Sequence, residues 1–188
     1  MSSGNSNAVF PHGVTIWLTG LSGAGKSTLA AALRTRFEKF AAQVEILDGE
    51  ELRKHSSAGL GFTKADRDEH IRRIGEMAKR LTEKQSVVIV AAISPYRAAR
   101  EQVRQRIGNF VEVYCRCPLE IAEARDTKGL YKRARRGELI CFTGIDDPYE
   151  EPLQPDVVVD TNKETMSESV HKICSALHRL GYLTGTFK

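Results

Sequence analysis

The segment at residues 20–27 constrains this chain more than any other. It reads Gly-Leu-Ser-Gly-Ala-Gly-Lys-Ser, which matches the phosphate-loop pattern G-x-x-x-x-G-K-S/T at every required position. A predicted strand precedes it and a predicted helix follows it, which is the context that the pattern requires. Its glycines let successive backbone N–H groups turn toward one anion, and the start of the helix adds a partial positive charge. We therefore expect the loop to bind a nucleoside triphosphate.

Two side chains of this loop carry the expected chemistry. Lys26 is expected to reach the β- and γ-phosphates, and the Ser27 hydroxyl is expected to bind Mg²⁺. The cofactors predicted from the pattern are therefore ATP and Mg²⁺. The predicted ATP-binding residues of the loop are Gly20, Leu21, Ser22, Gly23, Ala24, Gly25, Lys26, Ser27 and Thr28.

Short β-rich runs alternate with amphipathic helical segments along the chain. The predicted strands are 14–19, 43–47, 87–93, 110–115 and 156–160. The third and fifth are almost continuously apolar, as strands buried on both faces are. The apolar stripes of the predicted helices comprise Leu29, Leu33 and Phe37; Ile71, Ile74, Met77, Ala78 and Leu81; Val103 and Ile107; and Val170, Ile173, Leu177 and Leu180. This alternation predicts an α/β fold with a parallel sheet.

Length, charge and cysteine content exclude several classes of protein. A chain of 188 residues predicts a single domain, 1–188, of which we expect 1–12 to be flexible. The longest apolar run, 87–93, is too short to span a membrane, and the N-terminus shows no signal-peptide pattern, so we expect a cytoplasmic protein. The net charge of +4 permits an anionic ligand. The cysteines, Cys115, Cys117, Cys141 and Cys174, form no zinc-type cluster and favour free thiols, with a regulatory disulfide as the alternative.

Binding a triphosphate leaves several protein classes open. A regulatory GTPase requires N-K-x-D to read guanine, whereas residues 162–165 read Asn-Lys-Glu-Thr, and no D-x-x-G ends the third predicted strand. A small kinase is the simplest remaining class. The alternatives are a kinase for another acceptor, such as a nucleotide or a sugar acid, and a non-catalytic nucleotide-binding module.

Several further segments point to one family of kinases. In chain order they are Asp-Gly-Glu-Glu-Leu-Arg at 48–53, Leu-Gly-Phe at 60–62, Asp-Arg at 66–67, Ile-Arg-Arg-Ile-Gly at 71–75, Ile-Ser-Pro-Tyr-Arg at 93–97, Lys-Gly-Leu-Tyr at 128–131 and Phe-Thr-Gly-Ile-Asp-Asp-Pro-Tyr-Glu at 142–150. Together they closely resemble adenylylsulfate kinase, which uses ATP to phosphorylate the 3′-hydroxyl of adenosine 5′-phosphosulfate (APS), giving 3′-phosphoadenylylsulfate (PAPS) in sulfate assimilation. The resemblance implies a P-loop kinase fold with five parallel strands in the order 2-3-1-4-5, flanked by helices, and a homodimer.

The resemblance also assigns residues to the acceptor side. It implies that Arg53 and Arg67 clamp the phosphosulfate and that Phe62 and Phe142 sandwich the adenine; as isolated residues, the arginines would more often be solvated and the phenylalanines buried in the core. The predicted substrate-binding residues are Asp48, Glu50, Arg53, Phe62, Arg67, His70, Ile93, Ser94, Lys128 and Phe142. Glu50 and His70 depart from the Asp and Asn that are common in the family.

Lys26, Asp48 and Ser94 are the predicted catalytic residues. Asp48 follows the second predicted strand and is expected either to contact Mg²⁺ with Ser27, directly or through water, or to accept the proton of the 3′-hydroxyl; the alternative is an Asx turn at Asp-Gly. Ser94 is expected to contact the substrate, and its local sequence suits a helix N-cap with Pro95 at the first helical position. A phosphorylated Ser94 intermediate is a second possibility, but in-line transfer does not require one.

The segment at about 125–155 breaks the strand–helix alternation. Its first part, 125–136, carries six basic residues against one Asp, a local net charge of +5. We expect a basic lid that supplies countercharge to two anionic substrates. Arg125 is assigned to ATP and Lys128 to the acceptor, whereas Arg133 and Arg135 are expected on a solvated face. No aromatic platform accompanies the run, so we expect small-molecule partners and no nucleic acid.

Overall fold

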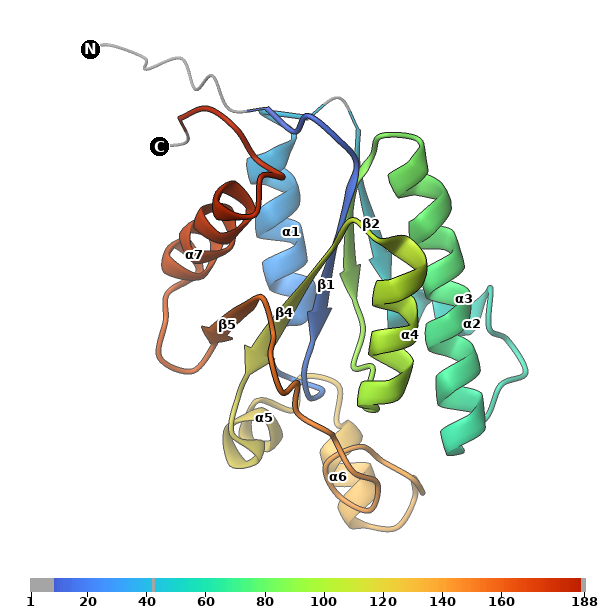
Figure 1. Ribbon diagram of the computed structural model, residues 1–188. Coiled ribbons are helices and arrows are strands. Elements are labelled where there is room, and N and C mark those ends of the chain that lie inside the picture. The colour runs from blue at the N-terminus through green and yellow to red at the C-terminus, as the bar shows by residue number, and fades with distance from the viewer. Residues whose placement is uncertain (1–8, 42, 187–188) are drawn as a thin grey trace.

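One parallel sheet forms the centre of the molecule in the computed structural model, which describes residues 9–41 and 43–186 (Figure 1). Its strands are β1 (Val14–Thr19), β2 (Val44–Asp48), β3 (Val87–Ala91), β4 (Phe110–Arg116) and β5 (Val157–Asp160). Their order is β2-β3-β1-β4-β5 and every neighbouring pair is parallel, so the predicted topology is confirmed. The predicted strand boundaries agree within two residues; β3 ends at Ala91, before the predicted residue 93.

Helices cover both faces of the sheet. They are α1 (Lys26–Phe37), α2 (Gly49–Lys54), α3 (Lys64–Glu83), α4 (Arg97–Ile107), α5 (Leu119–Arg125), α6 (Leu130–Arg135) and α7 (Met166–Arg179). In Figure 1, α1 and α7 lie on one side of the sheet and α3 and α4 on the other, while α5 and α6 lie beyond one end. This double cover explains why every residue of the central strands β1 and β3 is buried.

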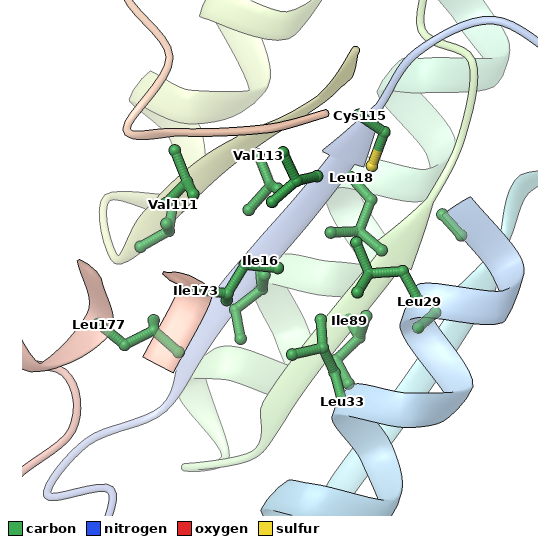
Figure 2. Close-up of a cluster of buried hydrophobic side chains, with 14 of the residues drawn as sticks. Ile16, Leu18, Leu29, Leu33, Ile89, Val111, Val113, Cys115, Ile173 and Leu177 are labelled. Atoms are coloured by element: carbon green, nitrogen blue, oxygen red, sulfur yellow. The ribbon is translucent and has the colours of Figure 1, made fainter. Parts of the chain in front are cut away.

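The side chains of β1 alternate between two apolar clusters. Ile16 and Leu18 pack with Leu29 of α1 and Ile173 of α7, as Figure 2 shows. Trp17 points to the opposite face and packs in the cluster that α3 and α4 cover. Successive side chains of a strand point to opposite faces, so one strand supplies both halves of the core.

Local capping fixes where the long helices begin. Thr63 caps α3, and its side chain and that of Asp66 each accept a hydrogen bond from the other's backbone N–H. Thr165 and Glu168 form the same capping box at α7. The predicted stripe of α7 was wrong at Leu180, which is 42% exposed, because the helix ends at Arg179 and the chain turns at Gly181.

The segment at 125–155 is built mainly from turns around two carboxylates. Asp126 accepts hydrogen bonds from the backbone N–H groups of Tyr131 (3.1 Å) and Lys132 (3.0 Å) at the start of α6. Asp146 accepts from the N–H groups of Cys141 (2.6 Å) and Phe142 (2.5 Å). Side-chain-to-backbone bonds thus replace the periodic pattern that this segment lacks. That this segment acts as a lid stays a prediction. The assignment of residues 1–188 to a single domain also stays a prediction.

The two ends of the described chain meet. Val9 and Thr184 exchange two backbone hydrogen bonds of 3.0 Å. The flexibility predicted for residues 1–12 falls mostly on residues 1–8, which lie outside the described residues. Among the described residues, no helix is long and apolar enough to cross a membrane.

Candidate active site

A cavity of about 1010 Å³ lies where the loops after β1, β2 and β3 meet the segment at 125–143. Parallel α/β sheets place their binding sites at this edge, where the strands end. All the predicted site residues line it except Gly20, Leu21 and Ala24. The structure therefore brings the predicted nucleotide and acceptor residues to one cavity.

The phosphate loop presents a helix N-terminus to this cavity. Gly25 is the N-cap of α1 with a φ of 82°, and no side chain satisfies the first N–H groups of the helix. Gly23 also has a positive φ, and a Cβ there would lie 2.7 Å from the Ala122 carbonyl oxygen. Both positions therefore require glycine, and the uncapped N–H groups can bind an anion.

Lys26 is almost fully buried at the base of the cavity. Its ammonium donates to the carbonyl oxygens of Gly20 (2.9 Å) and Leu21 (2.7 Å). Burial lowers the pKa of Lys26 to about 8, against the attraction of Asp48 and Glu50. A phosphate group arriving beside this ammonium would stabilise its charged form.

Asp48 joins the phosphate loop to the acceptor side. One carboxylate oxygen accepts from the Ser27 hydroxyl at 2.7 Å. The other accepts from the N–H groups of Glu50 (2.9 Å) and Glu51 (3.4 Å) and so caps α2. The Asx turn, which was the structural alternative for Asp48, is present, and Asp48 also lines the cavity. Its role toward Mg²⁺ or a proton stays a prediction.

Arg53 and Arg67 surround Phe62. Their guanidinium carbons lie 5.0 and 5.6 Å from the centre of its ring, and Phe62 itself is 52% exposed. Arg67 is 7% exposed and donates to the carbonyls of Phe62 (3.0 Å) and Cys141. The solvated alternative for Arg67 and the core alternative for Phe62 are therefore wrong. Burial and the charge of Arg67 lower the pKa of Arg53.

Phe142 faces the same cavity from the other side. Its ring packs edge-on against Tyr131, with ring centres 5.0 Å apart, and the Tyr131 hydroxyl donates to the Ser22 carbonyl at 2.9 Å. Tyr131 thus links Phe142 to the phosphate loop. Tyr131 belongs to the quoted Lys-Gly-Leu-Tyr segment, but sequence reasoning gave it no role of its own.

His70 lines the cavity with both ring nitrogens already engaged. Nε2 lies 2.9 Å from the Gly49 carbonyl and Nδ1 lies 2.8 Å from the Ser57 hydroxyl. The carbonyl only accepts, so Nε2 carries the proton and Nδ1 accepts from Ser57. Burial, together with the charge of Arg53, lowers the pKa of His70 to about 4, which keeps the ring neutral at physiological pH.

Ser94 is buried at the cavity wall, with 1% of its surface exposed. Its oxygen accepts from the Trp17 indole at 3.0 Å, and its hydroxyl donates to Thr19 at 2.9 Å. The predicted N-cap role was wrong, because α4 begins at Arg97 with Tyr96 as N-cap. The Ser94 hydroxyl bonds to Trp17 and Thr19, which are distant in the chain, and it does not cap α4.

The basic residues at 125–136 form ion pairs and hydrogen bonds, some of them in the cavity lining and some outside it. Lys128 forms an ion pair with Glu50 of α2. Arg125 donates to the carbonyls of Gly23 (3.3 Å) and Thr161 (2.7 Å), so it spans the phosphate loop and the loop after β5. Arg135 pairs with Glu123 at 2.8 Å and is 54% exposed, as expected for a solvated face. Arg133 is also exposed, but it reaches the cavity lining as well.

The Asp-Asp-Pro-Tyr-Glu segment is anchored by side chains that sequence reasoning missed. The Tyr96 hydroxyl donates to both carboxylate oxygens of Asp147 at 2.9 Å. The hydroxyls of Tyr149 and Thr19 lie 2.9 Å apart. These partners lie far apart in the chain, so no local pattern could have paired them.

Known proteins resemble this chain over most of its length. The family model described as Adenylylsulphate kinase matches residues 12–160. Adenylyl-sulfate kinase of Microcystis aeruginosa is 56% identical over 172 residues, covering 92% of this chain and 95% of that protein. The corresponding protein of Gloeothece citriformis is 57% identical, covering 92% and 98%.

Solved structures show the same likeness. APS kinase of Mycobacterium tuberculosis, in complex with AMPPNP and APS, has a TM-score of 0.84 and 40% identity, covering 89% of this chain and 99% of that chain. The hexameric APS kinase of Thiobacillus denitrificans has a TM-score of 0.70 and 36% identity, covering 93% of this chain and 30% of that chain.

Proposed function

The chain belongs to the adenylylsulfate kinase family, and we propose that its cavity holds ATP on the phosphate loop and APS between Phe62 and Phe142. Its reaction is the ATP-dependent phosphorylation of APS on the 3′-hydroxyl, which gives ADP and PAPS. One observation carries the assignment of residues: a single cavity joins the Lys26–Ser27–Asp48 cluster to the Phe62, Phe142, Arg53 and Arg67 group.

On the ATP side, we propose that the N–H groups at the start of α1 and Lys26 bind the phosphates. The Lys26 ammonium would exchange its two carbonyl partners for phosphate oxygens. Arg125 donates to the Thr161 carbonyl, in the loop after β5, and lines the cavity. From there it would contact the nucleotide. Preorganised charges of this kind stabilise the transferring phosphoryl group.

On the APS side, we propose that the two phenylalanine rings stack on the adenine. Arg53 donates to the Gly61 carbonyl at 2.8 Å and takes part in none of the ion pairs of the described residues. It would bind the phosphosulfate together with Lys128. Arg67 is engaged by Phe62, Cys141 and Asp147, so we assign it to holding the two aromatic loops in place. His70 similarly fixes the Gly49 carbonyl.

The donor set of Ser27 and Asp48 fits Mg²⁺. A hydroxyl and a carboxylate oxygen, 2.7 Å apart, are the hard oxygen ligands that this ion prefers. No cluster of three or more His, Cys, Asp or Glu residues that could hold a metal occurs in the described chain. Mg²⁺ needs no such cluster, because it takes one or two carboxylates with water and substrate phosphates. We propose that Ser27 and Asp48 hold it, directly or through water, where it would neutralise phosphate charge.

We propose direct transfer of the phosphoryl group, without a phosphorylated Ser94. Phosphorylation of Ser94 would remove the hydrogen that its hydroxyl donates to Thr19 and would place a dianion at a residue that is only 1% exposed. We propose that Asp48 receives the proton of the 3′-hydroxyl once APS is bound, because its carboxylate lines the same cavity. Ser94 then shapes the cavity wall together with Ile93.

Two further predictions rest on the family resemblance and the cysteines. A homodimer is expected, and light scattering after gel filtration would measure its mass. A cytoplasmic location is supported by the free thiols of Cys115, Cys117, Cys141 and Cys174.

The test is ADP production against a panel of acceptors, measured by a coupled assay. The panel holds APS, a nucleoside monophosphate and a sugar acid at matched concentrations, with a no-acceptor control. We expect multiple turnovers that depend on APS and little stimulation by the others. Equal stimulation by another acceptor, or a single-turnover burst with APS, would overturn the assignment.

A further inference from the structure

Two loops that wall the acceptor side of the cavity are joined outside it. The Glu150 N–H donates to the Pro95 carbonyl at 2.8 Å, and the Arg97 N–H donates to the Glu150 carboxylate at 2.8 Å. The loop after β3 therefore carries the segment at 142–150, which includes Phe142. The position of this aromatic ring depends on how firmly the two loops are joined.

Arg100 of α4 lies at the centre of this junction. Its guanidinium donates to the Ser94 carbonyl (2.6 Å), to the Glu150 carbonyl (2.7 Å) and to the Glu112 carboxylate of β4 (2.7 Å). Only 3% of Arg100 and 8% of Glu112 are exposed. Three segments far apart in the chain thus converge on one planar cation.

The planar guanidinium can hold the Ser94 and Glu150 carbonyls at a fixed separation. Arginine presents its N–H groups in a rigid fork, whereas lysine offers a single flexible ammonium. Ser94 has a φ of 44°, a conformation that a residue with a side chain rarely adopts without support. The bond from Arg100 to its carbonyl supports this conformation from behind the cavity wall.

Arg100 does not touch the cavity. No residue of α4, all of which is described, is among those that line it. Glu112 is in turn held by Arg104 and by its own N–H, which donates to Asp156 at 2.7 Å. The cation is therefore fixed from the sheet side. It acts on the acceptor loops through two backbone carbonyls and through the ring of Tyr149, whose centre lies 5.8 Å from the guanidinium carbon.

From these contacts we propose that Arg100 is a positioning residue for the acceptor, holding Ser94 and the 142–150 segment at the separation that APS binding requires. The proposal rests on the proposed function, since it names a determinant of the same acceptor site. It separates the two substrates, because none of the hydrogen bonds, ion pairs and ring contacts of Arg100 in the described chain involves the phosphate loop at 20–27. Loss of the Arg100 guanidinium should therefore weaken APS binding and leave ATP binding unchanged.

The test compares Arg100→Lys and Arg100→Met with Arg106→Met as the matched control. Arg106 lies on the same helix, is 49% exposed and pairs only with Glu76 among the ion pairs of the described residues. Steady-state kinetics give KM for each substrate, and ATP-analogue binding and thermal melting report on the fold. We expect KM for APS to rise about tenfold or more in both Arg100 variants, with KM for ATP within about twofold, because small displacements in a binding site have effects of that size.

Arg100→Lys separates positioning from charge. Lysine keeps a cation beside Glu112, so it should melt closer to the wild type than Arg100→Met does, yet it should retain the raised KM for APS. A wild-type KM for APS in Arg100→Lys, or equal rises in both KM values, would overturn the proposal. Absence of APS-dependent turnover in the wild-type enzyme would instead refute the proposed function.

Discussion

Replacing Lys26 by methionine should nearly abolish turnover and leave the fold intact. The variant keeps the length of the side chain and removes the ammonium that contacts the Gly20 and Leu21 carbonyls. Lys39→Met, at an exposed position just after α1, is the control. The ammonium has one structural and one electrostatic role, and the two can be estimated separately.

The structural role of the ammonium is small. A pKa of about 8 instead of 10.5 means that the charged lysine, with its hydrogen bonds included, is about 3 kcal/mol less stable in the folded chain than in water at neutral pH. The net change in unfolding free energy should therefore stay within about 3 kcal/mol. A unit charge about 4 Å from a phosphate is worth about 4 kcal/mol at an effective dielectric of 20, which is about a thousandfold in rate.

The pH dependence of stability provides a second, independent readout. The folded-state pKa lies below that of the unfolded chain, so between pH 8 and 10.5 the unfolded chain binds more protons at this lysine. The stability of the wild type relative to Lys26→Met should therefore rise across that window. Coupled ADP assays and chemical denaturation at several pH values measure both effects. More than about a tenth of wild-type activity, or a pH-independent stability difference, would refute the reasoning.

Two further predictions concern the acceptor side. Phe62→Ala and Phe142→Ala should each raise KM for APS by roughly 5- to 150-fold with little change in KM for ATP, since stacking on a base is worth about 1–3 kcal/mol; unchanged KM values would remove the rings from the site. His70→Asn should flatten the loss of stability on acidification from pH 6.5 to about 4, because the neutral buried ring of the wild type must be charged as it unfolds; identical melting curves of wild type and variant across that range would show that His70 does not titrate as stated.

The sheet was predictable because its determinants are local. Strands buried on both faces read as continuous apolar runs, and the phosphate loop fixed β1 and α1 by pattern alone. The short helices α2, α5 and α6 carried no periodic signal, since each is too short to show an apolar stripe. Carboxylates hold the first turns of two of them, Asp48 at α2 and Asp126 at α6.

Most of the predicted site residues line one cavity, but their contacts could not be predicted from the sequence. The resemblance supplied Arg67, His70 and Ser94 as substrate contacts, whereas the structure shows each of them committed to partners in the protein. In the sequence, Arg100 is one of several arginines in a predicted amphipathic helix, and nothing local marks it as buried. Its burial depends on Glu112 and Glu150, which only the fold brings to it.

The central claim is that one cavity transfers the γ-phosphoryl group of ATP to the 3′-hydroxyl of APS. The most direct test is ³¹P NMR of the product formed from ATP and APS, with mass spectrometry of the same sample. The account predicts one new phosphomonoester on the 3′-oxygen, formed in equal amount to ADP, with the phosphosulfate bond intact. ADP without this product, or a phosphoryl group on any other oxygen of APS, would contradict it.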